Sequence, residues 1–356
     1  MSPDWTEVAE RSVQALGVQH GELIEVTDLA GRFDVLSEFV LAIERRGATP
    51  RVELLSPELM SRLVSSSPVS ALSEWTRHRI EWMSKADRVL AFEGHDPSLN
   101  VDHETLDVWI QATDRVTEVE ERRKLPFMLI AVPTEERANS LGMDLETMEG
   151  ALLPALGVSS AELETEINRA LRVLENASRL VVQTDGHRLE LDISGRDWMQ
   201  DTGVIPDADG PRTVQPVVNL PAGSVYTTVQ EWSASGSLSL PRARDAVNVV
   251  FHFKDGRVAD IEAESGAESI IRVFDQHSGE PRRISHLGIG LNPRLHQPLG
   301  WPLVDEHRHG TLFFAFGENR YLGGENESSL NVDFVIPDAS LLADDRVVVE
   351  NGKLLV

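Results

Sequence analysis

The chain has 356 residues, with 58 Asp and Glu against 33 Lys and Arg, and a formal net charge of −25 at pH 7. This acidic balance argues against binding to nucleic acid or to an anionic membrane surface, since both require basic side chains. The absence of cysteine excludes disulfides, thiolate metal sites and a cysteine nucleophile. No apolar run approaches the length of a membrane span, and the acidic N-terminus is unlike a signal peptide, so we expect a cytoplasmic protein.

Helix and strand patterns alternate through the first half of the chain. The expected strands are residues 22–27, 49–56, 86–94 and 125–133, and the expected helices are 4–16, 33–46, 57–64, 69–82 and 101–120. The last two strands are continuous apolar runs, which are typical of strands buried on both faces. This order predicts an open parallel sheet flanked by helices. No glycine-rich phosphate-binding motif follows any of these strands.

The pattern changes near residue 178. Residues 136–175 are predicted to be helical, but beyond them polar and apolar residues alternate between short turns such as TDGH, KDGR and ENGK. The clearest helix in this second half is AESIIRVFDQHS. We therefore expect two domains, an α/β domain over 1–177 and a β-dominated α+β domain over 178–356.

Residues 282–335 concentrate side chains that suit a functional site. The stretch holds four of the eleven histidines and one of the two tyrosines, and glycines recur along it. Glycine allows close backbone approach, and histidine with aspartate on neighbouring strands provides a site on a rigid scaffold. We expect the chemistry of the chain to lie here.

Blocks of the second half resemble, in order, those of the aminopeptidase T family of metallopeptidases. The blocks are TDGHRLELDISGR, VNLPAGSVYTTV, FKDGRV, ISHLGIGLNP, DEHRHGTLFFAFG, NVDFVI and VVVENGKLLV. The resemblance implies the fold of that family and a homo-oligomer, most simply a dimer.

The metal ligands of that family are mostly replaced in this sequence. Ser224, Phe313 and Asn331 stand where the family has glutamate, histidine and histidine, and His286 stands where it has a second glutamate. Of these ligands only Asp333 is retained. A dinuclear site needs bridging carboxylates, so we do not expect a functional dinuclear aminopeptidase.

The site pattern is more similar to that of the 2,5-dihydroxypyridine 5,6-dioxygenases, which share the scaffold. Those enzymes hold one Fe(II) with two histidines and one aspartate, a ligand set that leaves positions open for a hydroxylated ring and dioxygen. His286 and Asp333 match two of the ligands, and Asn331 stands in the place of the second histidine. The resemblance implies one Fe(II) or other divalent metal held by these three residues, or no metal.

Further residues complete the predicted site. The catalytic candidates are His286, Tyr226 and Tyr321, and the candidates for substrate contact are Ser224, Phe313 and His309. Phe313 would either form an apolar wall for a planar ring or pack in the core. For His307 and His309, which flank Arg308, a surface cluster is the simpler interpretation.

The expected function is that of an enzyme acting on a small polar aromatic or heteroaromatic compound, patterned on ring-cleaving dioxygenation of a hydroxylated pyridine. One alternative is a hydrolase using one metal or none, with His286 as general base and Asp333 orienting it. Another is an inactive relative that binds a ligand or a partner. We expect a small-molecule substrate and no nucleic-acid or membrane partner.

Overall fold

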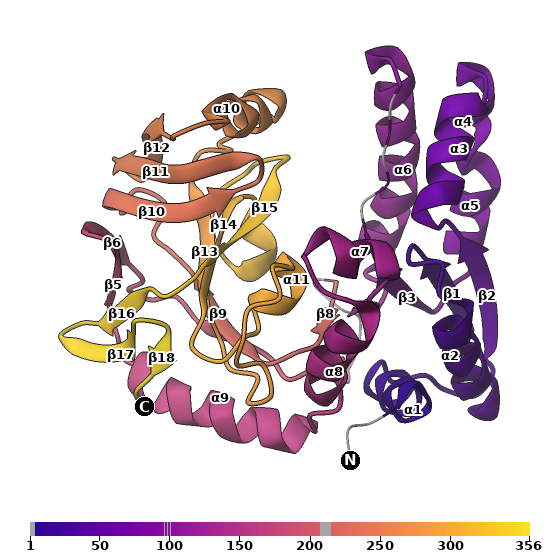
Figure 1. Ribbon diagram of the computed structural model, residues 1–356, viewed down its shortest axis with the longest axis horizontal. Helices are drawn as coiled ribbons and strands as arrows, with labels where there is room; N and C mark the ends of the chain where they lie inside the picture. The colour runs from indigo at the N-terminus through magenta and orange to yellow at the C-terminus, as the bar shows by residue number, and fades with distance from the viewer. Residues whose placement is uncertain (1–3, 96, 98, 100, 207–214) are drawn as a thin grey trace. The chain divides into compact units, whose positions relative to one another are not determined.

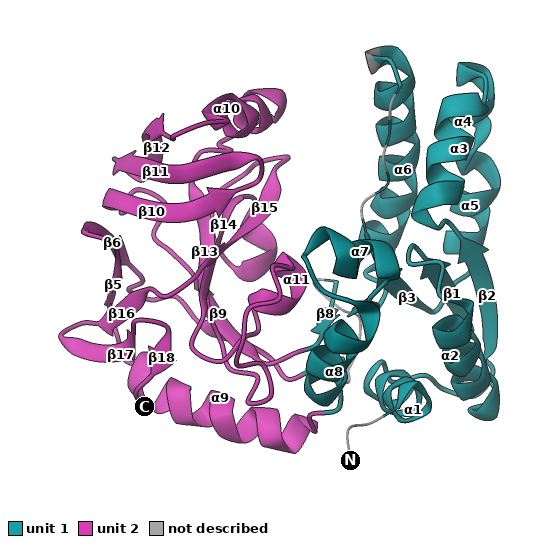
Figure 2. Cartoon of the chain, in the orientation of Figure 1, with its two compact units in different colours: residues 1–157, 203–221 teal, residues 158–202, 222–356 magenta. Residues whose placement is uncertain are grey.

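The computed structural model describes residues 4–95, 97, 99, 101–206 and 215–356. Contacts divide the chain into two compact units (Figure 2). Unit 1 comprises residues 1–157 and 203–221, and unit 2 comprises residues 158–202 and 222–356. The chain therefore passes between the units three times.

Unit 1 contains a five-stranded sheet, sheet A, in the order β2-β1-β3-β4-β8, and all its neighbours pair in parallel (Figure 1). Its strands are β1 (Leu23–Asp28), β2 (Thr49–Leu54), β3 (Arg88–Glu93), β4 (Phe127–Ala131) and β8 (Val217–Leu220). Its helices are α1 (Trp5–Ala15), α2 (Phe33–Arg45), α3 (Pro57–Ser66), α4 (Val69–Glu74), α5 (Thr76–Met83), α6 (His103–Arg123), α7 (Glu135–Ser140) and α8 (Leu145–Leu156). The predicted α/β class with a parallel sheet is confirmed.

Helix periodicity explains how unit 1 forms its core. In α2, Val35, Phe39 and Ile43 recur at intervals of four residues and are fully buried. The ring of Phe39 meets that of Phe92 on β3 edge-on, with centroids 4.8 Å apart. Such pairs add to the stability that burial of each ring already provides.

Unit 2 is built on two antiparallel sheets, in agreement with the predicted β-dominated second half. Sheet B has the order β12-β11-β10-β6-β5-β16-β17-β18, and sheet C has the order β15-β14-β13-β9-β7. The strands of sheet B are β5 (Arg179–Thr184), β6 (His187–Asp192), β10 (Ser235–Ala243), β11 (Ala246–Lys254), β12 (Arg257–Glu262), β16 (Ser340–Ala343), β17 (Arg346–Glu350) and β18 (Lys353–Leu354). Those of sheet C are β7 (Trp198–Asp201), β9 (Ser224–Thr228), β13 (Ile284–Gly290), β14 (Leu312–Gly317) and β15 (Asn331–Ile336).

An aromatic core joins one face of sheet C to β11 and to a helix. Phe316 of β14 lies 5.4 Å from Phe251 of β11 and 5.1 Å from Phe274 of α10, measured between ring centroids. The other helical segments of unit 2 are α9 (Ser160–Leu174), α11 (Pro302–Asp305) and the 3₁₀ turn η1 (Arg320–Leu322), while α10 spans Ala267–Gln276. Because side chains alternate along a strand, this packing leaves the opposite face of sheet C for other residues.

The division into units departs from the predicted boundary between residues 177 and 178. Helix α9 belongs to unit 2, where it contacts β9, and the apolar run VVNL forms β8 at the edge of sheet A. Hydrophobic periodicity shows that a strand or helix forms, but it does not show which sheet the strand joins.

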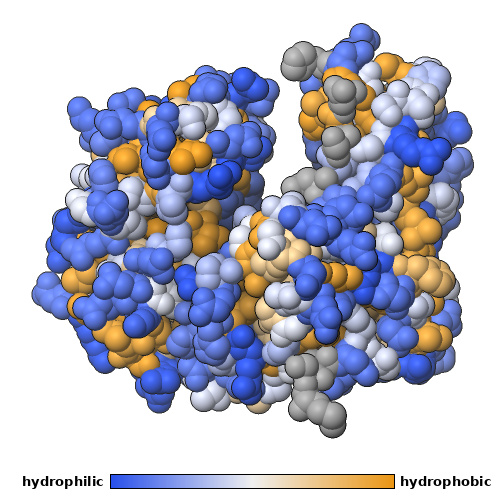
Figure 3. Space-filling view, viewed as in Figure 1, coloured by the Kyte–Doolittle hydropathy of each residue, from blue (hydrophilic) through white to orange (hydrophobic). Residues whose placement is uncertain are grey.

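The surface agrees with the acidic, polar composition. Hydrophilic side chains predominate on the face shown in Figure 3, and apolar ones are scattered between them. Among the described residues, no helix is both long enough and apolar enough to cross a membrane.

Candidate functional site

The strand register of sheet C brings separated parts of the sequence to one face. Tyr226 of β9 and Phe313 of β14 both pair with Gly288 of β13. His286 lies two residues before Gly288 and pairs with a residue of β14 that in turn pairs with Asp333 of β15. Residues two apart on a strand point the same way, so these five positions share the face opposite the aromatic core.

Three rings gather around Gly288. The ring centroids of Tyr226 and His286 are 5.6 Å apart, and Phe313 lies 6.1 Å from His286 and 6.5 Å from Tyr226. A Cβ atom at Gly288 would overlap the ring of Phe313, so only glycine leaves space for that ring. Phe313 therefore lies on the same face as His286 and Tyr226.

A β-bulge at Ser285 sets the hydrogen bonding of His286. The register shifts between Ile284 and His286, and the Ser285 hydroxyl lies 3.1 Å from Nδ1 of His286. That hydroxyl donates its single proton to the carbonyl of Glu318, at 2.7 Å. Since its oxygen is then left to accept, the hydrogen bonds assign a proton to Nδ1 of His286.

The other ring nitrogen of His286 faces Asp333. Nε2 of His286 lies 3.2 Å from Oδ1 of Asp333, and their side chains are 8% and 40% exposed. With the proton on Nδ1, Nε2 of a neutral imidazole is an acceptor, as is the carboxylate. Two acceptors this close form a site for a proton or a cation. A residue that orients His286 as a general base would contact Nδ1. Ser285 takes that position, whereas Asp333 faces Nε2.

Two more predicted residues lie on β15 and the loop before it. Nδ2 of Asn331 donates a 3.2 Å hydrogen bond to the hydroxyl of Tyr321, and both residues are exposed in this unit. Partial burial of the hydroxyl and the charge of Asp333 raise the pKa of Tyr321 to about 12. The Tyr321 hydroxyl therefore stays protonated at neutral pH and is a donor.

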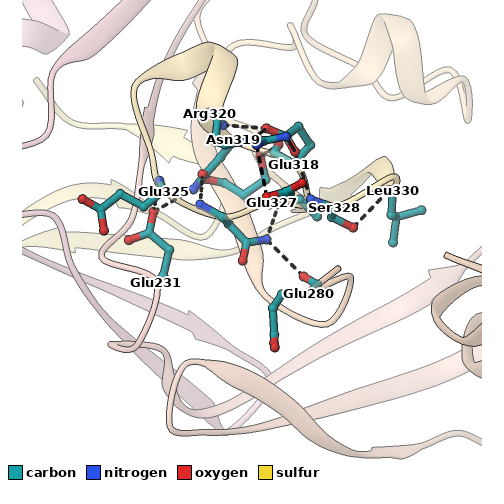
Figure 4. Close-up of polar contacts among 12 residues, drawn as sticks. Glu231, Glu280, Glu318, Asn319, Arg320, Glu325, Glu327, Ser328 and Leu330 are labelled. Carbon is teal, nitrogen blue, oxygen red and sulfur yellow. Dashed lines mark hydrogen bonds and ion pairs between the residues drawn. The ribbon is translucent and has the colours of Figure 1, made fainter. Parts of the chain in front are cut away.

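A buried carboxylate holds the loop that carries Tyr321. Oε1 of Glu231 accepts hydrogen bonds from the backbone nitrogen of Glu325 and from Nδ2 of Asn319, at 2.7 and 3.2 Å (Figure 4). Its Oε2 lies 2.5 Å from Arg196. Burial acts to raise the pKa of Glu231, but these donors outweigh burial and lower it. The ionised carboxylate thus fixes both ends of the turn around Tyr321.

A second polar cluster lies at the other end of the same face. Ser224 pairs with Gly290 of β13 and Asp201 of β7, and the backbone around His307 crosses so close to Gly290 that a Cβ there would overlap it. Nε2 of His307 lies 3.2 Å from Oε1 of Glu306 and 4.0 Å from Oδ2 of Asp201. Ser224 and His307 are each 2% exposed.

Burial and mutual contact shift the pKa values in this cluster. Burial raises the pKa of Glu306, although the nearby imidazole of His307 opposes the rise. For His307 burial acts to lower the pKa, but the Glu306 and Asp201 carboxylates outweigh burial and raise it. Burial also raises the pKa of Tyr226, and the charges of Asp201, Glu306 and Asp333 add to that rise. The carboxylates of both polar clusters therefore act on the hydroxyl of Tyr226.

The interpretation of the HRH run as a surface cluster is wrong for His307. Burial and backbone contacts place His307 at one end of the site face, because the segment folds over Gly290 instead of following the surface. His309, the predicted substrate contact, lies elsewhere: its Nε2 is 3.6 Å from Glu166 of α9. Burial lowers the pKa of His309, and its charged neighbours are on α9 and at His296, not in the ring cluster.

The donors on this face do not fit the implied iron site. Among the described residues, no group of three or more His, Cys, Asp or Glu side chains is placed to hold a metal ion. The distance of 3.2 Å between Nε2 of His286 and Oδ1 of Asp333 suits two adjacent metal ligands. Two donor atoms that each lie about 2.1 Å from an ion, at right angles to one another, are about 3 Å apart. The third donor is missing, because an amide at Asn331 replaces an imidazole and its nitrogen donates to Tyr321.

Sequence reasoning missed three members of the site face. Gly288 had no specific signal, since no strand was predicted over Ile284–Gly290 and Gly288 was one of several glycines in residues 282–335. Ser285 had none, because only the bulge brings its hydroxyl to the imidazole. Glu306 looked like a surface residue, because a local run of charged residues does not show that the segment packs against β13.

Comparisons with known proteins agree with this architecture. The structure of wild-type AmpT from Thermus thermophilus is 18% identical, with a TM-score of 0.77 over 99% of both chains. That of 2,5-dihydroxypyridine dioxygenase from Pseudomonas putida KT2440 is 17% identical, with a TM-score of 0.61 over 99% of this chain and 97% of that one. These likenesses confirm the predicted aminopeptidase T-like fold.

Sequence comparison identifies the family. None of the curated proteins matches the chain. The sequence profile of 2,5-dihydroxypyridine 5,6-dioxygenases, NicX, matches residues 145–356, which is more than half of the chain and includes every residue of the site face. The chain therefore belongs to the 2,5-dihydroxypyridine 5,6-dioxygenase family.

Proposed function

We propose that the chain is a dioxygenase-like enzyme whose substrate is a small hydroxylated aromatic or heteroaromatic compound bound on the site face of sheet C. The observation that carries the proposal is the pairing of His286 with Asp333 beside the rings of Tyr226 and Phe313. Family membership favours oxidative ring cleavage as the reaction class. Flat rings and a proton acceptor together suit a planar substrate with an ionisable hydroxyl.

His286 supplies the first chemical step in this proposal. With Nδ1 protonated towards Ser285, its Nε2 accepts the proton of a substrate hydroxyl. The imidazolium that forms is stabilised by the carboxylate of Asp333, 3.2 Å away. The substrate is left as a more electron-rich anion, which is the form in which hydroxylated rings react with oxidants.

The neighbouring residues bind and orient the ring. Phe313 supplies an apolar wall, and the protonated hydroxyls of Tyr226 and Tyr321 are donors to oxygen atoms of the substrate. Asn331 positions Tyr321 through its hydrogen bond. Ser224 lies two residues from Tyr226 on the same face of β9.

The test is turnover of a panel of dihydroxypyridines and dihydroxybenzenes, followed by dioxygen uptake and loss of ring absorbance, with and without added Fe(II). We expect activity with at least one compound and none in His286→Ala. If His286 is only a core residue, the variant instead loses about 1–3 kcal/mol of stability and its activity follows the folded fraction. That outcome, or no turnover of the panel under any metal condition, contradicts the proposal.

A hydrolase is the second candidate, favoured by the aminopeptidase T-like fold and by Nε2 of His286 as a proton acceptor beside Asp333. In that case His286 would take a proton from water instead of from the substrate. Chromogenic aminoacyl substrates with zinc, cobalt or manganese provide the test. We expect no cleavage, and turnover at ordinary aminopeptidase rates would replace the dioxygenase-like proposal with the hydrolase.

A further inference from the structure

The strand order of sheet A marks a point where the chain's connections diverge. From β1 the chain moves outward to β2 on one side, and from β3 it moves to β4 on the other. In open parallel sheets of this order, the crevice outside the carboxyl ends of the two diverging strands is where ligands bind. In unit 1 that point lies after Asp28 and Glu93, the last residues of β1 and β3.

A cavity of about 410 Å³ lies at this point. Residues that follow three different strands line it, including Gly31 and Arg32 after β1, His95 after β3 and Thr134 after β4. Its size falls within the range of sites for small molecules. All its lining residues belong to unit 1, and none of them is a residue of the site face of unit 2.

The loops around the cavity are closely fitted. A Cβ at Gly94 would lie 2.8 Å from Cα of Ala30, so the segments after β1 and β3 approach as only glycine allows. Oδ1 of Asp28 accepts hydrogen bonds from the backbone nitrogens of Ala30 and Gly31, two lining residues, at 2.9 and 2.8 Å. Its Oδ2 is buried without a hydrogen-bond partner in the described part of the chain.

His95 ties the wall of the cavity together. Its Nδ1 lies 3.1 Å from the hydroxyl of Thr134, and its Nε2 lies 3.2 Å from Oε1 of Glu58. The hydroxyl of Thr134 also accepts from the backbone nitrogen of Arg137, so its proton is available to Nδ1. The imidazole then donates from Nε2 to Glu58 and orients that carboxylate at the rim.

The charges around the cavity determine what it can bind. Four carboxylates line it, those of Asp34, Glu58, Glu135 and Glu136. The single arginine, Arg32, is already engaged by Asp34, Glu149 and the carbonyl of Pro133. The surplus of negative charge repels phosphates and carboxylates and attracts cations. No metal-binding group forms among the described residues, so a metal ion is a poor candidate.

We propose that this cavity is a second ligand site, which binds a small organic cation carrying primary ammonium groups. Ammonium hydrogens are donors that pair with the rim carboxylates, while Thr134 and His95 form the floor contacts between the loops. The inference does not depend on the reaction proposed for unit 2.

Three probes of equal chain length test the charge preference: 1,4-diaminobutane, neutral 1,4-butanediol and anionic succinate. Calorimetry with the full chain is expected to show the diamine binding at least about tenfold more tightly than either of the others. NMR titration is expected to shift the His95 ring and the Gly31 and Thr134 amide signals first. Equal binding of the diol or succinate, or shifts confined to other residues, overturns the proposal.

Charge-neutral variants separate this site from general attraction to an acidic protein. Glu58→Gln and Glu135→Gln are each expected to weaken diamine binding about twofold to fivefold, the range for exposed ion pairs. Glu44→Gln is the matched control, because Glu44 is exposed near the far end of α2, about 16 Å along the helix from Phe33. A loss of affinity in the control as large as in the rim variants contradicts a specific site.

Discussion

At the scale of single residues, the orientation of His286 depends on its neighbour. Ser285 is fully buried and spans from Nδ1 of the imidazole to the carbonyl of Glu318. Second-layer hydrogen bonds of this kind typically change activity about tenfold to a hundredfold. We therefore expect Ser285→Ala to lower kcat by about that factor with little change in KM, because the nitrogen facing Asp333 is no longer fixed.

Two variants control the Ser285 experiment. Ser285→Thr retains the hydroxyl and is expected to recover most of the turnover, whereas Ser239→Ala removes a hydroxyl from sheet B and should leave kcat unchanged. Steady-state kinetics corrected for folded fraction is the measurement. An unchanged kcat in Ser285→Ala would show that the bulge has no part in the chemistry.

Asn331 is the position at which the metal content of the site can be tested. Asn331 and Asp333 share a face of β15, and His286 is 3.2 Å from Asp333, so an imidazole at 331 would complete two histidines and a carboxylate. We expect wild-type protein to hold at most one divalent ion per chain, by elemental analysis. Asn331→His is expected to raise Fe(II) affinity about tenfold or more, since a ligand contributes at least as much as the residues that support it.

The control for the metal experiment is Asn331→Gln, which keeps an amide and should bring no gain in affinity. Calorimetric titration with Fe(II) under anaerobic conditions measures both variants. Two tightly bound ions in the wild type, or no gain in Asn331→His, would contradict the ligand arrangement described for His286 and Asp333.

At the scale of secondary-structure elements, β13 and β14 depend on each other through one missing side chain. A Cβ at Gly288 would overlap the Phe313 ring, so Gly288→Ala forces that ring to move. Overpacking of this kind costs about 1–3 kcal/mol. We expect Gly288→Ala to lower the free energy of unfolding by that amount and to raise KM, because the displaced Phe313 ring is the apolar wall proposed for the substrate.

A smaller side chain at Phe313 tests whether overpacking causes the loss of stability in Gly288→Ala. The double variant Gly288→Ala/Phe313→Leu is expected to be more stable than the sum of the two single changes allows, since leucine leaves space for the new methyl group. Denaturant unfolding of the four proteins gives the coupling energy. Strict additivity would mean that the two positions do not compete for space.

The elements were far more predictable from sequence than the contacts between them. Apolar patterns located α2, through its helical periodicity, and β3, as a continuous apolar run. Gly290 and His307 show where that information ends. Residues 306–308 cross β13 because the chain folds back over that strand. The local sequence of a loop does not show which strand the loop will cover.

At the scale of the whole molecule, a buried acid makes stability depend on pH. Burial raises the pKa of Glu120 on α6 from 4.5 to about 7, against a 2.6 Å hydrogen bond from Gln215. The folded state thus holds this proton more tightly than the unfolded state. The stabilisation is complete below about pH 4.5 and is lost as pH rises through about 7.

Glu120→Gln removes this titration while keeping an acceptor for Gln215. We expect wild type and variant to be similarly stable near pH 4.5, and the variant to be more stable by about 2–3 kcal/mol at pH 8. Thermal unfolding across that range gives the difference. If the difference in stability between wild type and Glu120→Gln does not change with pH, Glu120 is not the group that titrates.

Assembly is also testable at this scale. Sheet B ends in the strands β12 and β18, and unpaired edge strands of this kind can be covered by a second copy. We propose that the protein is a homo-oligomer, most simply a dimer. Light scattering at micromolar concentration should give at least twice the 39.4 kDa of one chain, and a particle of 39.4 kDa would contradict this.

The placement of β8 has a consequence for how the protein is made. The rest of sheet A is complete by residue 157, but its edge strand lies at Val217–Leu220, after the opening segment of unit 2. At about 5–20 residues per second, a ribosome needs roughly 3–13 s to add the intervening part of the chain. Through that interval the flank of β4 has no neighbour, so a nascent chain arrested before residue 217 exposes an adhesive edge to chaperones and to other nascent chains.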